Sequence, residues 1–142
     1  MASRAGSFGF REAALGFVAG ALSVFVFHQL TVWGLTGRQP WSAWAPTAPL
    51  GVPVMLSIAF WGGVWGVVFA LFAPRLPGGL MFYVAGFFFG AILPTLAGWT
   101  IVAFLKGQPY GPRGLWWTGP VINGVWGFGT AVFMTLLRRL AR

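Results

Sequence analysis

The chain has 142 residues, of which 58% are hydrophobic and 7% are charged, and it has no cysteine. A soluble domain usually carries about 25% charged residues, so this chain has too few to cover a water-facing surface. The lack of cysteine excludes disulfides, thiolate catalysis and cysteine-ligated metals. The net charge of +8 would suit nucleic acid, but the basic residues lie between apolar runs instead of on one patch, so no nucleic-acid partner is expected.

Four apolar stretches are long enough to cross a bilayer, which takes about 20 residues of helix. They predict one all-α integral membrane domain over residues 1–142, a four-helix bundle with spans at Ala13–Leu35, Leu50–Ala73, Leu80–Leu105 and Gly119–Leu137. None of the stretches alternates apolar and polar residues, which argues against strands. The first is longer than the apolar core of a signal peptide and no Ala-x-Ala site follows it, so it is expected to stay uncleaved.

Prolines and tryptophans shape the predicted ends of these spans. Pro53, Pro94 and Pro120 lie inside or at the start of spans, where they are expected to kink or begin helices. The connection Thr36–Pro49 holds three prolines and is predicted to be a stiff, non-helical loop. Six indoles lie on one side of the predicted membrane: Trp33, Trp41, Trp44, Trp99, Trp116 and Trp117. An aromatic belt at headgroup level is the main interpretation, and a docking surface for a partner or lipid is the alternative.

The basic residues predict the orientation. Six lie on one side of the predicted spans: Arg4, Arg11, Arg75, Arg138, Arg139 and Arg142. Three lie on the other side: Arg38, Lys106 and Arg113. Because cytoplasmic segments are enriched in Lys and Arg, both termini are expected in the cytoplasm of a bacterium, with the chain in the inner membrane. The only acidic residue, Glu12, falls in the first turn of the first span, where the helix dipole favours a carboxylate.

An internal duplication is visible in the even spans. Gly63–Gly66 and Gly124–Gly127 both read Gly-Val-Trp-Gly, which corresponds to an offset of 61 residues. An offset of 66 aligns the first and third spans, so that Gly20 meets Gly86. A two-span unit returns the chain to its starting side. The two hairpins, about residues 13–75 and 80–138, are therefore expected to be parallel repeats with a pseudo-two-fold axis along the membrane normal. Trp65 and Trp126 would then fill equivalent positions.

Small residues predict how the helices pack. Lipid tails are as apolar as leucine, so membrane helices associate through close contacts that glycine permits. The predicted packing glycines are Gly16, Gly20, Gly62, Gly66, Gly86, Gly90 and Gly127. Ser23, Thr31 and Gly34 continue the small-residue stripe of the first span, as Asn123 and Thr130 do in the fourth. Contacts within the bundle are the main interpretation, and a homo-oligomer interface is the alternative.

Polar side chains within spans are costly in lipid and mark candidate sites. The candidates for a ligand site or polar pocket are His28, Gln29, Ser57, Thr95 and Asn123. Hydrogen bonding between helices is the main interpretation, and a small pocket facing the outer side is the alternative. Neighbouring residues point about 100° apart on a helix, so His28 and Gln29 are not expected to face the same contact, and one is a candidate for facing another subunit. In the repeat, His28 and Asn123 align with residues that are not polar.

Several chemistries are not expected. No carboxylate lies at mid-membrane, which argues against an ion-coupled carrier. The chain has no Ser-His-Asp set, carboxylate pair, phosphate loop or nucleotide fingerprint, so it is not expected to be an enzyme. His28 alone lacks the companions of a zinc site, and no metal and no cofactor is expected. Haem would need a second histidine from another subunit, nothing in the sequence positions Met55 as an axial ligand, and quinone binding near His28 has no specific signal.

The segments Phe27–Gln29, Gly51–Pro53 and Phe60–Gly66 resemble a family of small four-span inner-membrane proteins of proteobacteria with no assigned activity. The resemblance covers most of the chain and implies a location without a mechanism. Three functions stay open: an accessory or assembly subunit of a membrane complex, a small oligomeric channel or carrier for a neutral or apolar molecule, and a quinone- or haem-associated subunit using His28. The first is favoured. The expected partners are membrane lipids and either further copies of the chain or a larger complex.

Overall fold

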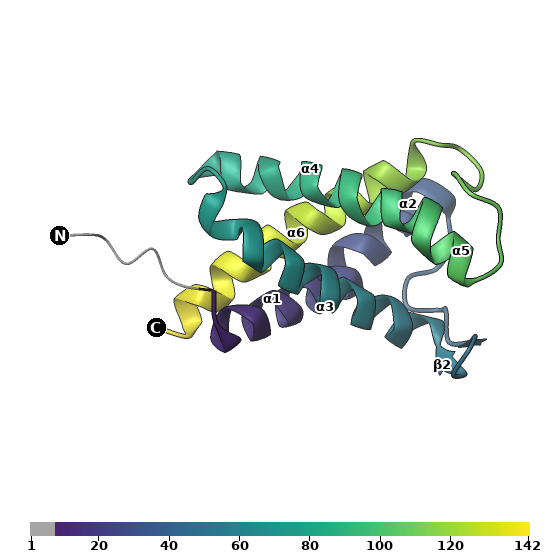
Figure 1. Cartoon of the computed structure of the whole chain (residues 1–142), viewed down its shortest axis with the longest axis horizontal. Coiled ribbons are helices and arrows are strands. Elements are labelled where there is room, and N and C mark those ends of the chain that lie inside the picture. The colour runs from purple at the N-terminus through teal and green to yellow at the C-terminus, as the bar shows by residue number, and fades with distance from the viewer. Residues whose placement is uncertain (1–7) are drawn as a thin grey trace.

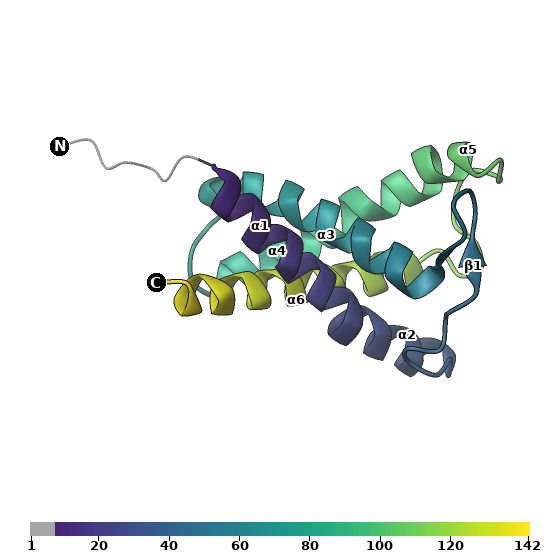
Figure 2. The ribbon, with the colours of Figure 1, turned by 90° about the horizontal axis from the view of Figure 1, so that it is seen from below.

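The computed structural model describes residues 8–142, so Arg4 lies outside the described residues. Four long helical rods run side by side (Figure 1). The C-terminus and the start of the first rod lie at one end, here called the inner end, together with the connection between the second and third rods. The other two connections meet at the opposite, outer end, as Figure 2 also shows. Each rod is long and apolar enough to cross a membrane.

The first rod comprises α1 (Phe10–Ser23), the π-helical turn η1 (Val24–His28) and α2 (Gln29–Thr36). The second comprises α3 (Val54–Phe72) and the 3-10 turn η2 (Ala73–Arg75). The third comprises α4 (Leu80–Ala97), the π-helical turn η3 (Gly98–Val102) and α5 (Ala103–Leu105), and the fourth is α6 (Thr118–Leu140). The predicted spans agree with these bounds to within a few residues at every end but one.

The second span begins later than predicted. Gly51 adopts a φ of 70°, and the short strand β2 (Val52–Pro53) pairs antiparallel with β1 (Pro46–Thr47). Pro53 then takes the N-cap position of α3. Leu50 is 84% exposed beyond the helix. Its apolar side chain looks like part of the span in sequence, because hydropathy alone does not show where a hairpin ends and a helix starts.

Two prolines affect other helices. Pro94 lies inside α4, and the wide turn η3 follows four residues later. A proline inside a helix removes one backbone hydrogen bond and clashes with the preceding turn, so the irregular outer end of this rod agrees with the expected kink. Pro120 lies in the first turn of α6, where the missing N–H has no intrahelical partner to lose.

α1 and α3 are in backbone contact. A Cβ atom added to Gly16 would lie 2.5 Å from the carbonyl oxygen of Gly66, closer than real Cβ atoms approach. A Cβ added to Gly20 would strike the carbonyl of Gly62. Only glycine therefore allows this approach.

α4 and α6 meet in the same way. A Cβ added to Gly86 would lie 2.7 Å from the carbonyl oxygen of Gly127, and one added to Gly90 would strike the carbonyl of Asn123. Gly86, Gly90 and Gly127 thus lie at the contact of α4 with α6, and the other four predicted packing glycines lie at the contact of α1 with α3. A Cβ added to Gly34, by contrast, would meet nothing within 4 Å, so Gly34 itself lies outside these helix contacts.

The two contacts revise the alignment of the odd spans. Gly16 contacts α3 as Gly86 contacts α6, and Phe17 covers a glycine of α3 as Phe87 covers one of α6. Both correspondences give an offset of 70 residues, one helical turn more than the 66 inferred from sequence. A shift of four residues keeps side chains on nearly the same helix face. Matches between short apolar runs therefore do not distinguish the two registers.

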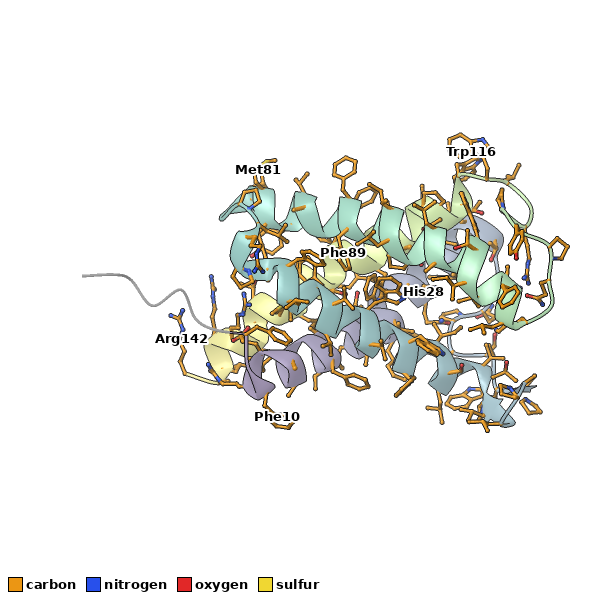
Figure 3. All side chains as sticks on the ribbon, viewed as in Figure 1. Phe10, His28, Met81, Phe89, Trp116 and Arg142 are labelled. Carbon is orange, nitrogen blue, oxygen red and sulfur yellow. The ribbon has the colours of Figure 1, made fainter. Side chains whose placement is uncertain are left out.

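The remaining two interfaces differ from each other. α1 packs directly on α6, where a Cβ added to Gly129 would lie 2.5 Å from Ser23 Oγ. α3 and α4 are instead bridged by aromatic rings, with the centroids of Phe69 and Phe89 5.2 Å apart. Phe89 lies at the middle of the assembly (Figure 3). A two-fold axis relating the hairpins would make these interfaces equivalent, so the arrangement departs from the expected symmetry.

Candidate functional site

Among the five predicted polar residues, Gln29 has a polar neighbour at both its side-chain oxygen and its side-chain nitrogen. It begins α2 directly after the turn η1 and is only 7% exposed. Its Oε1 accepts a hydrogen bond from the backbone N–H of Trp41 at 3.1 Å, and its Nε2 lies 3.4 Å from Nδ1 of His28. The side chain of Gln29 therefore faces the connection between α2 and α3 of its own chain. The partly buried His28 stays the candidate for facing another subunit.

Trp41 has a backbone that a bulky residue rarely adopts, with φ at 56°. Its Nε1 donates to the carbonyl of Phe25 in η1 at 2.7 Å, and its own carbonyl accepts from Nε1 of Trp44 at 2.7 Å. Together with the bond to Gln29, these contacts hold the left-handed conformation against a cost of about 1–3 kcal/mol. Phe25, Gln29, Trp41 and Trp44 are called the outer latch below.

The connection between α2 and α3 is also hydrogen-bonded to the second rod. The N–H groups of Val54 and Met55, at the start of α3, donate to the carbonyls of Ala45 at 3.0 Å and Ala43 at 2.9 Å. The connection is thus bonded to α3 on one side and, through the outer latch, to η1 and α2 on the other. The aromatic side chains that it carries are held on an ordered backbone.

Thr95 and Asn123 form a second polar pair. Nδ2 of Asn123 on α6 donates to Oγ1 of Thr95 on α4 at 2.9 Å, and Thr95 is 3% exposed. This pair fits hydrogen bonding between helices. Ser57 is partly buried on α3, and among the described residues its side chain has no hydrogen bond. The structure therefore joins two pairs of the five candidates and leaves Ser57 apart from both.

The most deeply buried polar cluster surrounds Trp126, which is 3% exposed. Its Nε1 donates to the carbonyl of Gly20 at 2.9 Å. Its carbonyl accepts from Oγ of Ser23 at 2.6 Å and from Oγ1 of Thr130 at 2.9 Å. The bonds of Trp126 to Gly20 and Ser23 join the first and fourth rods within the buried core, and the bond to Thr130 lies within α6. The stripes that contain Ser23 and Thr130 indicated a helix contact. The repeated tetrapeptide singled out Trp126, but it did not indicate the hydrogen bond of Trp126 to α1.

Trp65, in the first copy of the tetrapeptide, has different surroundings. It is only partly buried, and its ring packs edge-on against Phe89 with centroids 6.3 Å apart. Trp126 instead contacts the backbone of α1. The two tryptophans therefore do not fill equivalent positions, because α6 packs on α1 while α3 is separated from α4 by aromatic rings.

Two cavities lie away from these polar groups. One of about 210 Å³ lies between α4 and α6, and one of about 420 Å³ lies where α1, α3 and α6 meet at the inner end. None of the five candidate residues lines either cavity. Within residues 8–142, no group of three or more His, Cys, Asp or Glu side chains is placed to hold a metal ion. Met55, the other candidate haem ligand, is fully buried in the core beside Trp126.

No protein-family model, curated protein or solved structure matches this chain. The resemblance to proteobacterial inner-membrane proteins therefore stays a prediction. The structure itself shows an all-helical chain with four helices that have the length and composition of membrane spans. Any functional proposal has to come from the geometry described above.

We expect Gln29→Leu to release the outer latch. Without Oε1 the N–H of Trp41 loses its acceptor, and a typical hydrogen bond contributes about 0.5–1.5 kcal/mol. Hydrogen exchange at residues 38–45 should then be about twofold to tenfold faster, since 1.4 kcal/mol corresponds to a factor of ten. Ser57→Ala is the matched control and should leave this exchange unchanged. Equal exchange in the wild type and Gln29→Leu would show that Gln29 does not hold the connection.

Proposed function

We propose that this chain is a polytopic protein of the bacterial inner membrane, with both termini cytoplasmic, that acts as a non-catalytic accessory or assembly subunit of a membrane complex. The four apolar rods support insertion. The charge distribution supports the orientation. Five of the described basic residues belong to the inner end: Arg11, Arg75, Arg138, Arg139 and Arg142. Three belong to the outer connections: Arg38, Lys106 and Arg113.

We further infer that the bundle consists of two related hairpins. The paired glycine contacts of α1 with α3 and of α4 with α6 support this relationship. The symmetry is approximate, because aromatic rings separate α3 from α4 while α1 touches α6 directly. In such a scaffold, two copies of one helical hairpin form the core, and the two outer connections can differ in sequence and conformation.

The outer surface is the observation that carries the functional proposal. It consists of five aromatic residues in or beside the outer connections, between 39% and 68% exposed: Trp41, Trp44, Tyr110, Trp116 and Trp117. Tryptophan and tyrosine are enriched where protein partners bind. This surface lies at the end of the bundle, on connections that hydrogen bonds hold in place.

Two indoles of the outer surface are held by hydrogen bonds. Nε1 of Trp41 and Nε1 of Trp44 donate to backbone carbonyls of the same chain. These two rings are fixed in orientation, so a partner that packs against them would restrict their side chains little further.

The packing gives less support to a channel within one chain. Two helix contacts are closed at the level of the backbone by glycine. The contact of α1 with α6 is filled by the indole of Trp126, which hydrogen-bonds to Gly20. A polar path along the bundle would have to displace this cluster.

Native purification in mild detergent with mass spectrometry of bound proteins tests the proposal. Trp116→Ala, at the outer surface, should reduce a stoichiometric partner by about tenfold or more, as loss of an interface hot spot does. Trp61→Ala is the matched control, because this indole is 56% exposed on α3 within a span. It should retain the partner. A wild-type preparation containing only copies of this chain would overturn the proposal.

A further inference from the structure

The larger cavity lies at the inner end, where the start of α1, the end of α3 with η2, and the end of α6 converge. Its volume of about 420 Å³ falls within the range of about 300–1,000 Å³ that is usual for small-molecule sites. This inner pocket has a polar side, formed by Arg11, Glu12 and Arg138, and an apolar side, where Phe8 and Pro74 are exposed and Ala70 and Ala73 are buried beneath them.

An ion pair builds the polar side. Nη2 and Nε of Arg138 donate to Oε2 of Glu12 at 2.7 and 3.1 Å, with both side chains about one-third to one-quarter exposed. Nη2 of Arg11 donates to the backbone carbonyl of Ala141 at 2.8 Å. These contacts tie the start of α1 to the end of α6 and hold two guanidinium groups at the pocket.

The charge of the pocket is positive. Glu12 is the only acidic residue of the whole chain, and it is paired with Arg138. The guanidinium of Arg11 contacts an uncharged carbonyl and keeps further N–H donors. An anion is therefore the ligand that this pocket attracts, and a phosphate oxygen is a good acceptor for a guanidinium fork.

The depth of the pocket identifies the kind of anion. Arg11 and Arg138 lie in the terminal turns of α1 and α6, while Pro74 lies in η2 at the inner end of the second rod. Polar and apolar walls thus meet at the boundary of the spans, where a phospholipid has its phosphate above its glycerol and acyl chains. A free phosphate ion would use only the polar side.

We propose that the inner pocket binds one anionic phospholipid of the inner leaflet, with its phosphate on Arg11 and its glycerol and upper acyl chain against Phe8 and Pro74. Basic pockets between membrane helices on the cytoplasmic side recognise such headgroups. This site rests on the membrane insertion proposed above and is independent of any protein partner.

The test is native mass spectrometry of the purified full chain with phosphatidylglycerol or phosphatidylcholine of the same acyl composition. The wild type should bind phosphatidylglycerol preferentially. Arg11→Gln should lower its occupancy about fivefold, the change expected for loss of one basic side chain near a headgroup. Arg142→Gln removes the same charge from the same end but outside the pocket, and should leave occupancy unchanged.

Three results would overturn the site. Equal binding of the two lipids by the wild type would remove the proposal without any variant. Equal losses in Arg11→Gln and Arg142→Gln would show attraction to general surface charge. Displacement of phosphatidylglycerol by inorganic phosphate alone would reassign the pocket to the free ion. Trp116→Ala should keep full lipid binding, so failure of the proposed docking function and failure of this site are distinguishable.

Discussion

Gly66→Val is expected to separate α1 from α3 and to lower the free energy of unfolding by about 3 kcal/mol, the upper part of the usual range for overpacking. A Cβ on Gly66 would strike the carbonyl of Gly16, and backbone cannot rotate away as a side chain can. The helices would have to move apart and lose the close van der Waals contact that holds them in lipid. Equilibrium unfolding in mixed detergent measures the loss.

Gly98→Val is the control for this substitution. Gly98 is also helical, with φ at −61°, and an added Cβ would meet nothing within 4 Å. Its replacement should change stability by less than about 1 kcal/mol, the size of a propensity effect. Similar losses at Gly66 and Gly98 would mean that the contact of α1 with α3 does not hold the fold.

Trp126→Ala is expected to cost about 3–5 kcal/mol, as truncation of a buried aromatic residue does. The indole fills the contact between the first and fourth rods, and its Nε1 bonds to Gly20. Trp126→Phe keeps most of the volume and should cost about 1–3 kcal/mol, because the carbonyl of Gly20 then loses its donor. The unfolding free energies of both variants give the two contributions separately.

The natural control is Trp65→Ala, in the other copy of the tetrapeptide. Trp65 is partly buried and packs on Phe89 without a hydrogen bond to another helix among the described residues. Its truncation should cost at least about 1 kcal/mol less than that of Trp126. Identical costs would restore the symmetric bundle that the sequence predicts and would refute the unequal packing described here.

Composition and local spacing were sufficient to predict the spans and the residues between paired helices. Four runs of membrane length leave few alternatives to four helices, and glycines four residues apart on one face predict a close approach. Hydropathy failed at Leu50, where a hairpin precedes the helix. The predicted offset between the first and third spans was wrong by one helical turn. Apolar sequences one turn apart present similar residues on the same helix face, so the sequence did not distinguish the two alignments.

Features that depend on the meeting of distant segments could not be predicted. The left-handed backbone of Trp41 depends on Gln29 and Phe25, which lie on another element. The partner of Glu12 could have been any of several arginines at the same end, and the structure selects Arg138. The different surroundings of Trp126 and Trp65 arise from how the hairpins pack, which identical tetrapeptides do not encode.

The unequal packing also bears on function. The outer latch belongs to the first rod and its connection, and the Trp126 cluster joins the first rod to the fourth. The first rod thus links the core of the bundle to the outer surface. Under the proposed function, this link would hold the aromatic docking surface in a fixed position relative to the membrane.

Labelling of single cysteines tests most directly whether the chain crosses the membrane four times with its termini inside. Because the chain has no cysteine of its own, each variant carries one reporter. Ser42→Cys and Tyr110→Cys, in the outer connections, should react with a membrane-impermeant maleimide in spheroplasts. Gly78→Cys and Ala141→Cys, at the inner end, should react only after lysis. Labelling of an inner-end position in intact spheroplasts, or protection of an outer one, would contradict the account.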